Sequence, residues 1–308
     1  MADSTAVLAI VEPDISPREV VDRSAWLANL TGSTLELLLC DADVGPLGDM
    51  IFVSNEARDI AEQIRAAQEA MLEELAQSAR DRGVGVASGI LDMRPIADGI
   101  VHVALDRKPR YVVKATQYHS DAERAFLLDT DWQLIRNCPF PLWLVKPRPI
   151  AEKPVIIAAV DPMHSEDEQA RLDGVIIEHG KAIAAQAGGE LQLLHAYQPM
   201  RGVAAAARLN FKPVRLPVDE ISRKMEKEHR ARLDALAAEH GIAPDRTHQL
   251  PGSPRDLLPY LAREWNADLV VMGAVARGRG SGGAIGRTAE RVLDHLPCDV
   301  LILRPDTR

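Results

Sequence analysis

Aromatic residues make up only 4% of this 308-residue chain, although hydrophobic residues as a whole make up 46%. With so few large rings, the cores must be filled by Ala, Val, Leu and Ile. The 26% of charged residues is ordinary for a globular protein. At this length the chain is expected to form two domains of usual size.

Cysteine is scarce, and long apolar runs are missing. The three cysteines, Cys40, Cys138 and Cys298, are too few and too scattered for a disulfide framework or a zinc site, so we expect buried free thiols. No apolar run reaches the ~18 residues of a membrane span, and the first residues lack the basic segment of a signal peptide. These absences predict a cytoplasmic protein with no membrane partner.

Positive charge is also in short supply. The formal net charge is −9, with 36 Lys and Arg against 45 Asp and Glu. A general nucleic-acid surface needs a basic face that displaces counterions from phosphates, so no nucleic-acid partner is expected. A locally basic pocket for a smaller anion stays compatible with this balance.

Several nucleotide-binding and catalytic motifs are absent. The chain contains neither GxxxxGK[ST] nor a GxGxxG that opens a helix after the first expected strand, and it lacks HxGH and HExxH. No residue is an evident general base placed to activate water, so efficient catalysis is not predicted. We expect Trp132 and Trp143 to pack in the core, and His195, at a strand end, to be a packed histidine.

What the sequence does contain is an internal repeat. The two halves can be laid over each other in five pairs of segments: 7–13 with 156–162, 37–41 with 193–197, 94–95 with 253–254, 111–115 with 270–274, and 130–147 with 288–305. A period this long indicates a duplicated domain and not a solenoid unit. We place the domains at residues 1–148 and 153–308, and we expect the prolines of the linker 146–154 to separate the two sheets.

Each half alternates strands with helices. In the first half, strands are expected at 7–12, 34–40, 84–90, 110–115 and 141–146, with helices at 17–31, 55–82, 95–106 and 130–137. In the second half, strands are expected near 155–160, 190–196, 245–250, 268–273 and 299–304. Near-continuous apolar strands between helices predict an α/β fold with a five-stranded parallel sheet in each half, covered on both faces.

The most informative stretch is GAVARGRGSGGAIGRT, residues 273–288. Its glycine-rich, arginine-containing loop follows an apolar strand and precedes an amphipathic helix expected to begin at Thr288. This arrangement presents backbone N–H groups to a phosphate. Ligands of such sheets bind at the carboxyl ends of the strands, which places the candidate site among Asp161, 195–197, Gly252 and this loop. The alternative is a surface loop whose glycines only permit a turn and whose arginines are solvated.

At these residues the chain resembles the universal stress protein family. Nucleotide-binding members carry Gly, two residues, Gly, nine residues, Gly and then a small hydroxyl residue. Here Gly273, Ala276 and Gly286 follow that spacing, with Ala276 in place of the second glycine and Arg287 inserted before Thr288. The tandem layout covers nearly the whole chain and is similar to the UspE-type members of the family. That likeness is carried by residues 130–139, 143–146 and 286–295.

The resemblance implies a fold of the adenine nucleotide alpha hydrolase-like (HUP) type, with the two domains paired as an intramolecular pseudo-dimer through their last strands, 142–146 and 300–304. It also implies that the second half binds ATP or a related adenine nucleotide, accompanied by Mg²⁺. The residues expected at this site are Asp161, Tyr197, Met272, Gly273, Ala276, Arg277, Gly286, Arg287 and Thr288.

The first half lacks these features. The positions of Gly273, Ala276 and Gly286 are occupied there by Lys114, Gln117 and Leu128. Glu12 replaces Asp161, and Asp129 and Asp131 flank Thr130 at a helix N-terminus, where carboxylates would repel a phosphate. We therefore predict that the first half binds no nucleotide.

The favoured function is a cytoplasmic stress-response protein that binds a nucleotide in its second half and acts through conformation or partner choice. One alternative is a nucleotide-independent scaffold, or a carrier of an apolar ligand in the first half. Another, less favoured, is a slow ATP hydrolase in which Asp161 and the arginine loop hold a metal-nucleotide. The residues leave open whether two chains pair as a homodimer.

Overall fold

The computed structural model describes residues 6–41, 55–116, 130–163, 168–199, 218–274 and 292–305. In the first half, the strands are β1 (Ala6–Val11), β2 (Thr34–Leu39), β3 (Val86–Ile90), β4 (Tyr111–Ala115) and β5 (Leu142–Val145), and the helices are α1 (Pro17–Thr31), α3 (Asn55–Arg80), α4 (Ile96–Arg107) and α6 (Thr130–Asn137). These elements confirm the predicted α/β alternation to within about two residues at each end.

The second half repeats the pattern. Its strands are β6 (Val155–Ala159), β7 (Glu190–Tyr197), β8 (Thr247–Pro251), β9 (Leu269–Gly273) and β10 (Asp299–Leu303). Its helices are α7 (Glu168–Ala187), α9 (Val218–Glu239) and α10 (Pro254–Glu264), with a short 3-10 turn at Pro244–Arg246. The helix expected to begin at Thr288 starts outside the described residues.

Local sequence explains where helices begin and end. Helix α1 begins with Pro17, whose fixed φ suits the first helical position, and it ends at Gly32, which adopts a left-handed φ of 64°. Helix α10 also begins with a proline, Pro254, and the Ser253 hydroxyl before it accepts a hydrogen bond from the backbone N–H of Arg255. Nearby residues therefore mark the start and end of α1 and the start of α10.

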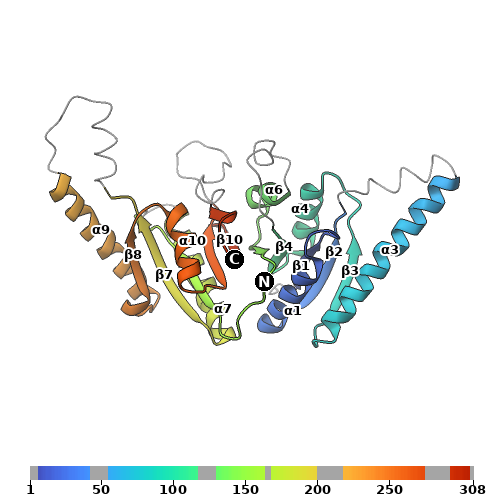
Figure 1. The fold of residues 1–308 in the computed structure, drawn as a ribbon, viewed down its shortest axis with the longest axis horizontal. Helices are drawn as coiled ribbons and strands as arrows, with labels where there is room; N and C mark the ends of the chain where they lie inside the picture. Colours follow the sequence, from blue (N-terminus) through green and yellow to red (C-terminus); the bar gives the residue numbers. More distant parts are fainter. Residues whose placement is uncertain are drawn as a thin grey trace, which may run out of the picture.

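The described strands form one ten-stranded sheet in the order β3-β2-β1-β4-β5-β10-β9-β6-β7-β8. All neighbours are parallel except β5 and β10, which pair antiparallel at the centre, with Leu144 opposite Val300 and Leu142 opposite Ile302. The halves lie side by side, with β3 and β8 toward opposite ends of the molecule (Figure 1). The predicted pairing of the last strands is thus confirmed. The expectation that the linker prolines separate two sheets is wrong, because β5 and β10 join their open edges.

Two apolar layers cover the two faces of this sheet. Buried residues of α1, α3, α7 and α9 form one core with the strand residues beneath them, and those of α4, α6 and α10 form the other. Each core includes residues of both halves, so the two domains share their interior. Tyr111 of β4 illustrates this, because its ring lies edge-on to Trp143 at 6.2 Å and to His179 of the second half at 6.0 Å.

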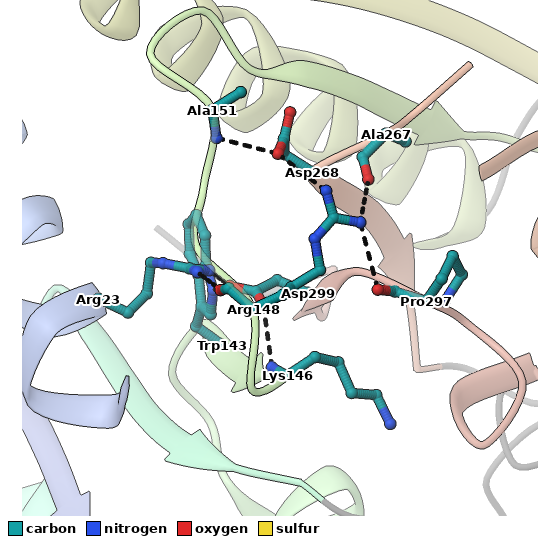
Figure 2. A network of polar contacts seen from close by, with 9 residues as sticks. All are labelled: Arg23, Trp143, Lys146, Arg148, Ala151, Ala267, Asp268, Pro297 and Asp299. Carbon is teal, nitrogen blue, oxygen red and sulfur yellow. Dashed lines mark hydrogen bonds and ion pairs between the residues drawn. The ribbon is translucent and has the colours of Figure 1, made fainter. Parts of the chain in front are cut away.

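The seam between the halves is closed around the carboxylate of Asp299, the first residue of β10, which is fully buried. Trp143 donates from Nε1 to Oδ2 at 2.7 Å, and the backbone N–H of Lys146 donates to Oδ1 at 2.9 Å. Arg23 of α1 forms an ion pair with Oδ2 of the same carboxylate. Figure 2 shows these first-half groups gathered around one second-half side chain.

A second buried carboxylate, that of Asp268, fixes the linker between the halves. Its Oδ1 accepts from the backbone N–H of Ala151 at 3.1 Å and from Arg148 at 3.2 Å (Figure 2). Its Oδ2 accepts from the backbone N–H of Val155 at 3.1 Å. The linker is thus bound to the Asp268 side chain, which helps to hold a proline-rich segment that has few backbone N–H groups to offer.

Arg148 joins the two carboxylate sites. It donates to the carbonyls of Ala267 and Pro297 at 3.3 Å each, and its own carbonyl accepts from Arg23 at 2.8 Å. Burial lowers the pKa of Arg23 to about 10, against the attraction of Asp268, so its guanidinium remains charged at neutral pH.

Other features of the core agree with expectation. Cys40, Cys138 and Cys298 are buried free thiols, and Trp132 and Trp143 are buried in the core. Among the described residues, no helix is long and apolar enough to cross a membrane.

Replacing Asp299 with Ala should lower the free energy of unfolding by about 3–5 kcal/mol, because Arg23 would remain buried without its partner carboxylate. Urea denaturation followed by circular dichroism measures this change. The matched control is Asp22→Ala, which removes a half-exposed ion pair with Arg82 and should cost no more than about 1 kcal/mol. Equal effects of the two substitutions would contradict the proposed role of Asp299.

Candidate functional site

At the carboxyl end of the first-half sheet, Lys114 of β4 carries a buried ammonium group. Its Nζ lies 2.6 Å from Oε2 of Glu12, which follows β1, and 2.7 Å from Oδ1 of Asp131 in the first turn of α6. It also donates to the carbonyl of Ala115 at 3.1 Å. All three charged side chains are at most 10% exposed. We call Lys114, Glu12 and Asp131 the charged triad.

The charged triad keeps its lysine protonated. Burial by itself would lower the pKa of Lys114, but the nearby carboxylates of Asp131 and Glu12 outweigh this effect and raise it above its usual value. The ammonium therefore ties the ends of β1 and β4 to the start of α6 from within. In the second half, Gly273 is aligned with Lys114 and Asp161 is aligned with Glu12. The first half therefore has a buried cation at the position where the second half has a glycine.

The triad corrects one part of the sequence argument. We expected the carboxylates near Thr130 to repel a phosphate at the helix N-terminus. Of the two, Asp131 instead turns inward to Lys114, and Asp129 lies outside the described residues. At the strand ends of the first half, the place that a phosphate would need is thus occupied by the buried charged triad.

In the second half, the structure places four of the predicted site residues. Tyr197 ends β7 and Gly273 ends β9, while Met272 precedes Gly273 and is buried. Asp161 follows β6 by two residues, and its side chain is 28% exposed. All four lie at the carboxyl ends of the strands, at the sheet edge expected for a ligand. The remaining five, Ala276, Arg277, Gly286, Arg287 and Thr288, lie outside the described residues.

Gly273 has a packing reason of its own. A Cβ atom built on it would lie 2.4 Å from Cδ2 of Leu172 in α7, so any larger residue would require Leu172 to move. Gly273 itself is partly exposed, whereas its counterpart Lys114 is buried. The glycine therefore serves the packing of α7 whether or not a ligand approaches the backbone at this point.

Asp161 is held by Asp173, which sequence reasoning did not find, and lies near His195, which the sequence had placed at the candidate site. Its backbone N–H donates to Oδ1 of Asp173 in α7 at 3.1 Å, and its Oδ1 lies 3.9 Å from Nδ1 of His195. Burial is the main cause that raises the pKa of Asp173 to about 7, and the carboxylate of Asp161 adds to the rise. Asp173 is thus poised between its charged and neutral forms near neutral pH.

His195 and Tyr197 share one face of β7, and His229 of α9 packs on both. The His229 ring lies 5.0 Å from the His195 ring and 4.9 Å from the Tyr197 ring. His195 is 1% exposed, which confirms the expectation of a packed histidine. The sequence offered a signal for this group only in the alternation of His195 and Tyr197. Asp173 and His229 come from helices and carried no motif.

Nothing in the described part of the chain forms a group of three or more His, Cys, Asp or Glu side chains arranged to hold a metal ion. Asp161 and Asp173 are nevertheless carboxylates at the site edge, the donor type that suits Mg²⁺.

The fold defines a tandem α/β protein in which two copies of one domain share a single sheet. The model of the universal stress protein family matches residues 5–146 and again residues 155–304. The chain belongs to the universal stress protein family.

Known relatives share the tandem arrangement. The chain is 26% identical to universal stress protein E of Escherichia coli K12 over 308 residues, covering 99% of this chain and 96% of the relative. It is 23% identical to universal stress protein E of Photorhabdus laumondii over 309 residues, with the same coverage. A solved structure of a functionally unknown protein from Pseudomonas aeruginosa PAO1 superposes with a TM-score of 0.74 at 27% identity, covering 98% of this chain and 93% of that one.

Replacing Lys114 with Met should lower the free energy of unfolding by about 3–5 kcal/mol at neutral pH, because two buried carboxylates would lose their shared cation. The deficit should shrink as the pH falls toward 4, since Glu12 and Asp131 can then become neutral. Urea denaturation at pH 7.5 and pH 4.5 measures both effects. The exposed Lys227→Met serves as control, and a pH-independent deficit in Lys114→Met would contradict the triad.

Replacing Asp173 with Asn should stabilise the protein at alkaline pH. Between pH 3.8 and about 7 the folded chain holds a proton on Asp173 that the unfolded chain releases, so wild-type stability falls as the pH rises through this window. The free energy of unfolding of the variant, minus that of wild type, should be roughly 2–4 kcal/mol larger above pH 7 than near pH 4. Chemical denaturation at a series of pH values tests this, with the exposed Asp106→Asn as control. Parallel pH profiles for wild type and Asp173→Asn would refute it.

Proposed function

We propose that this protein is a cytoplasmic stress-response protein that binds ATP or a related adenine nucleotide in its second half and acts by changing conformation or partner choice. Mg²⁺ would accompany the nucleotide, held through its phosphates and a carboxylate such as Asp161. The first half would bind no nucleotide and would serve as the structural partner of the second.

One observation carries the proposal: the two halves end the same strands in opposite ways. In the first half, Lys114 and two carboxylates are buried together at the strand ends. In the second half the matching residue is a partly exposed glycine, and Asp161 keeps 28% of its side chain exposed. A strand-end residue that has no side chain of its own can let a polar ligand approach its backbone closely.

The sequence that follows β9 supports the same assignment. Residues 275–288 supply glycines and arginines, which together can offer N–H groups and positive charge to phosphates. These residues lie outside the described part of the chain, and it is their composition and their match to the family spacing that support a phosphate-binding role. Tyr197, at the end of β7, would lie beside the nucleoside, and Met272 would lie under it.

A second candidate is a nucleotide-independent scaffold. The packing of Leu172 against Gly273 favours it, because the glycine is then explained without a ligand. The buried seam at Asp299 likewise shows a structure held together by its own groups. Native mass spectrometry of the purified protein separates the candidates, since a co-purified nucleotide supports the first and a bare chain the second.

Binding should be lost in Gly286→Glu, because a side chain with negative charge would occupy the place proposed for the phosphates. Titration of labelled ATP with Mg²⁺ should give weak-to-moderate affinity for wild type and at least tenfold weaker binding for the variant. Leu128→Glu changes the matching position of the first half and should leave affinity unaltered. Equal binding by wild type and Gly286→Glu would discard the site. Unaltered ATP affinity in Gly286→Glu together with weaker affinity in Leu128→Glu would place the nucleotide site in the first half.

A further inference from the structure

The seam between the halves joins two strands, β5 and β10, that correspond to each other in the internal repeat. By the alignment of the repeat, Pro141 corresponds to Asp299 and Trp143 corresponds to Leu301. In the antiparallel pairing of the two strands, Trp143 lies directly opposite Leu301. An approximate two-fold axis therefore passes through the seam at this point, and it relates residues that differ in size and in charge.

The helices beside the seam supply another unlike pair. Helices α1 and α7 end at Gly32 and Gly188, which both have a left-handed φ of 64°, and each helix leads into the second strand of its half. Arg23 and His179 lie equally far before these glycines, so they occupy corresponding places. The two-fold axis thus relates an arginine of the first half to a histidine of the second.

The contacts at these corresponding places are also unlike. Arg23 and Nε1 of Trp143 both reach the buried carboxylate of Asp299 (Figure 2). His179 instead packs edge-on against the ring of Tyr111, with 6.0 Å between the ring centroids. Burial lowers the pKa of His179 to about 4, so its ring is neutral at neutral pH and needs no anion beside it. One side of the axis is therefore a charged contact and the other side a neutral one.

Two copies of the first half would fit each other poorly along this strand. Arg23 of one copy would face Pro141 of the other, which has no carboxylate to offer a buried guanidinium. Two Trp143 rings would also meet at the axis, where the seam holds one indole and one leucine. Adding a ring to a packed core forces side chains and backbone to shift, which is destabilising.

Two copies of the second half would fail for the opposite reasons. Each buried Asp299 carboxylate would meet a neutral His179 where the seam provides Arg23, and it would lose the N–H that Trp143 donates. Burying a carboxylate without such partners is costly. Two Leu301 side chains at the axis would leave part of the indole's volume empty, and a cavity of this kind also lowers stability.

We infer that the seam is a specificity surface through which each half binds the unlike half of this protein and rejects a second copy of itself. The recognition elements are the Arg23–Asp299 ion pair and the matched sizes of Trp143 and Leu301. Because the unlike half already fills this strand edge in the intact chain, any partner protein or second copy must bind on a different surface.

Two substitutions in the intact chain reproduce the central contact of each like pair. Leu301→Trp places a second tryptophan opposite Trp143, and Trp143→Leu places a second leucine opposite Leu301. Each should lower the urea midpoint followed by circular dichroism. The double variant Trp143→Leu/Leu301→Trp restores one large and one small side chain in reversed order. Its midpoint should therefore lie above that of the less stable single variant, although it carries both changes.

The choice of partner is measured directly on a chain cut in its linker. A protease site inserted between the exposed residues Glu152 and Lys153 allows the folded protein to be cut into its two halves. Cut protein with and without ¹⁵N labelling is mixed, held in urea just below the unfolding midpoint, and returned to buffer. Native mass spectrometry should then show that labelled and unlabelled halves have exchanged, with like pairs below a tenth of all pairs. Pairing without preference would make about half of all pairs like pairs.

Two results would overturn the specificity surface. One is a fraction of like pairs above a tenth after exchange. The other is a double variant that is no more stable than the less stable single variant, because the sizes of the two residues would then not be matched to each other. The intact-chain variants decide the question if the cut halves do not exchange. If Leu301→Trp alone fails to fold, cooperative unfolding of the double variant fulfils the prediction.

Discussion

The buried carboxylate of Asp299 is the contact on which the architecture depends. It takes hydrogen bonds and an ion pair from Trp143, Lys146 and Arg23, all of the first half, while its own backbone begins β10, the second-half strand that lies at the centre of the ten-stranded sheet. A carboxylate this deeply buried is tolerated only where charged and polar partners surround it, so the two halves must dock in a single register. The antiparallel pairing of β5 with β10, and the continuous ten-stranded sheet, follow from that register.

Duplication has produced two outcomes at equivalent strand ends. The first half brings a lysine and two carboxylates together and keeps them out of water. The second half has Gly273 at the aligned position and surrounds Asp161 with Asp173, His195 and, beyond it, His229. One end is held by the buried charged triad, and the other includes Asp173, whose pKa is raised by burial to about 7. The two halves therefore have the same α/β architecture and differ in the charged groups at their strand ends.

Much of the fold could be predicted because its signals are local. Strands are indicated by short apolar runs such as 7–11 and 269–272, and the ends of α1 are marked by Pro17 and Gly32. The internal repeat indicates the duplication directly. The site could be predicted only in part. Asp161 follows a strand, and Tyr197 and Gly273 end strands, so these residues fall at the expected carboxyl ends of the sheet. Asp173 and His229 reach the same place from helices, and no spacing in the chain relates them to it.

The sequence by itself determined that this is a doubled α/β chain of the universal stress protein family, with unlike residues at the two strand ends. Helix and strand periodicity and the repeat are properties of short segments, so they need no knowledge of the rest of the chain. Only the tertiary structure decided that the protonated Lys114 pairs with Glu12 and Asp131, and that Asp299 accepts contacts from the first half where the two sheets join. It also decided that His195 forms a hydrogen bond with His229, 34 residues away. Those facts depend on burial and on distances between remote segments, which set the energy of a charge and are absent from the order of residues along the chain.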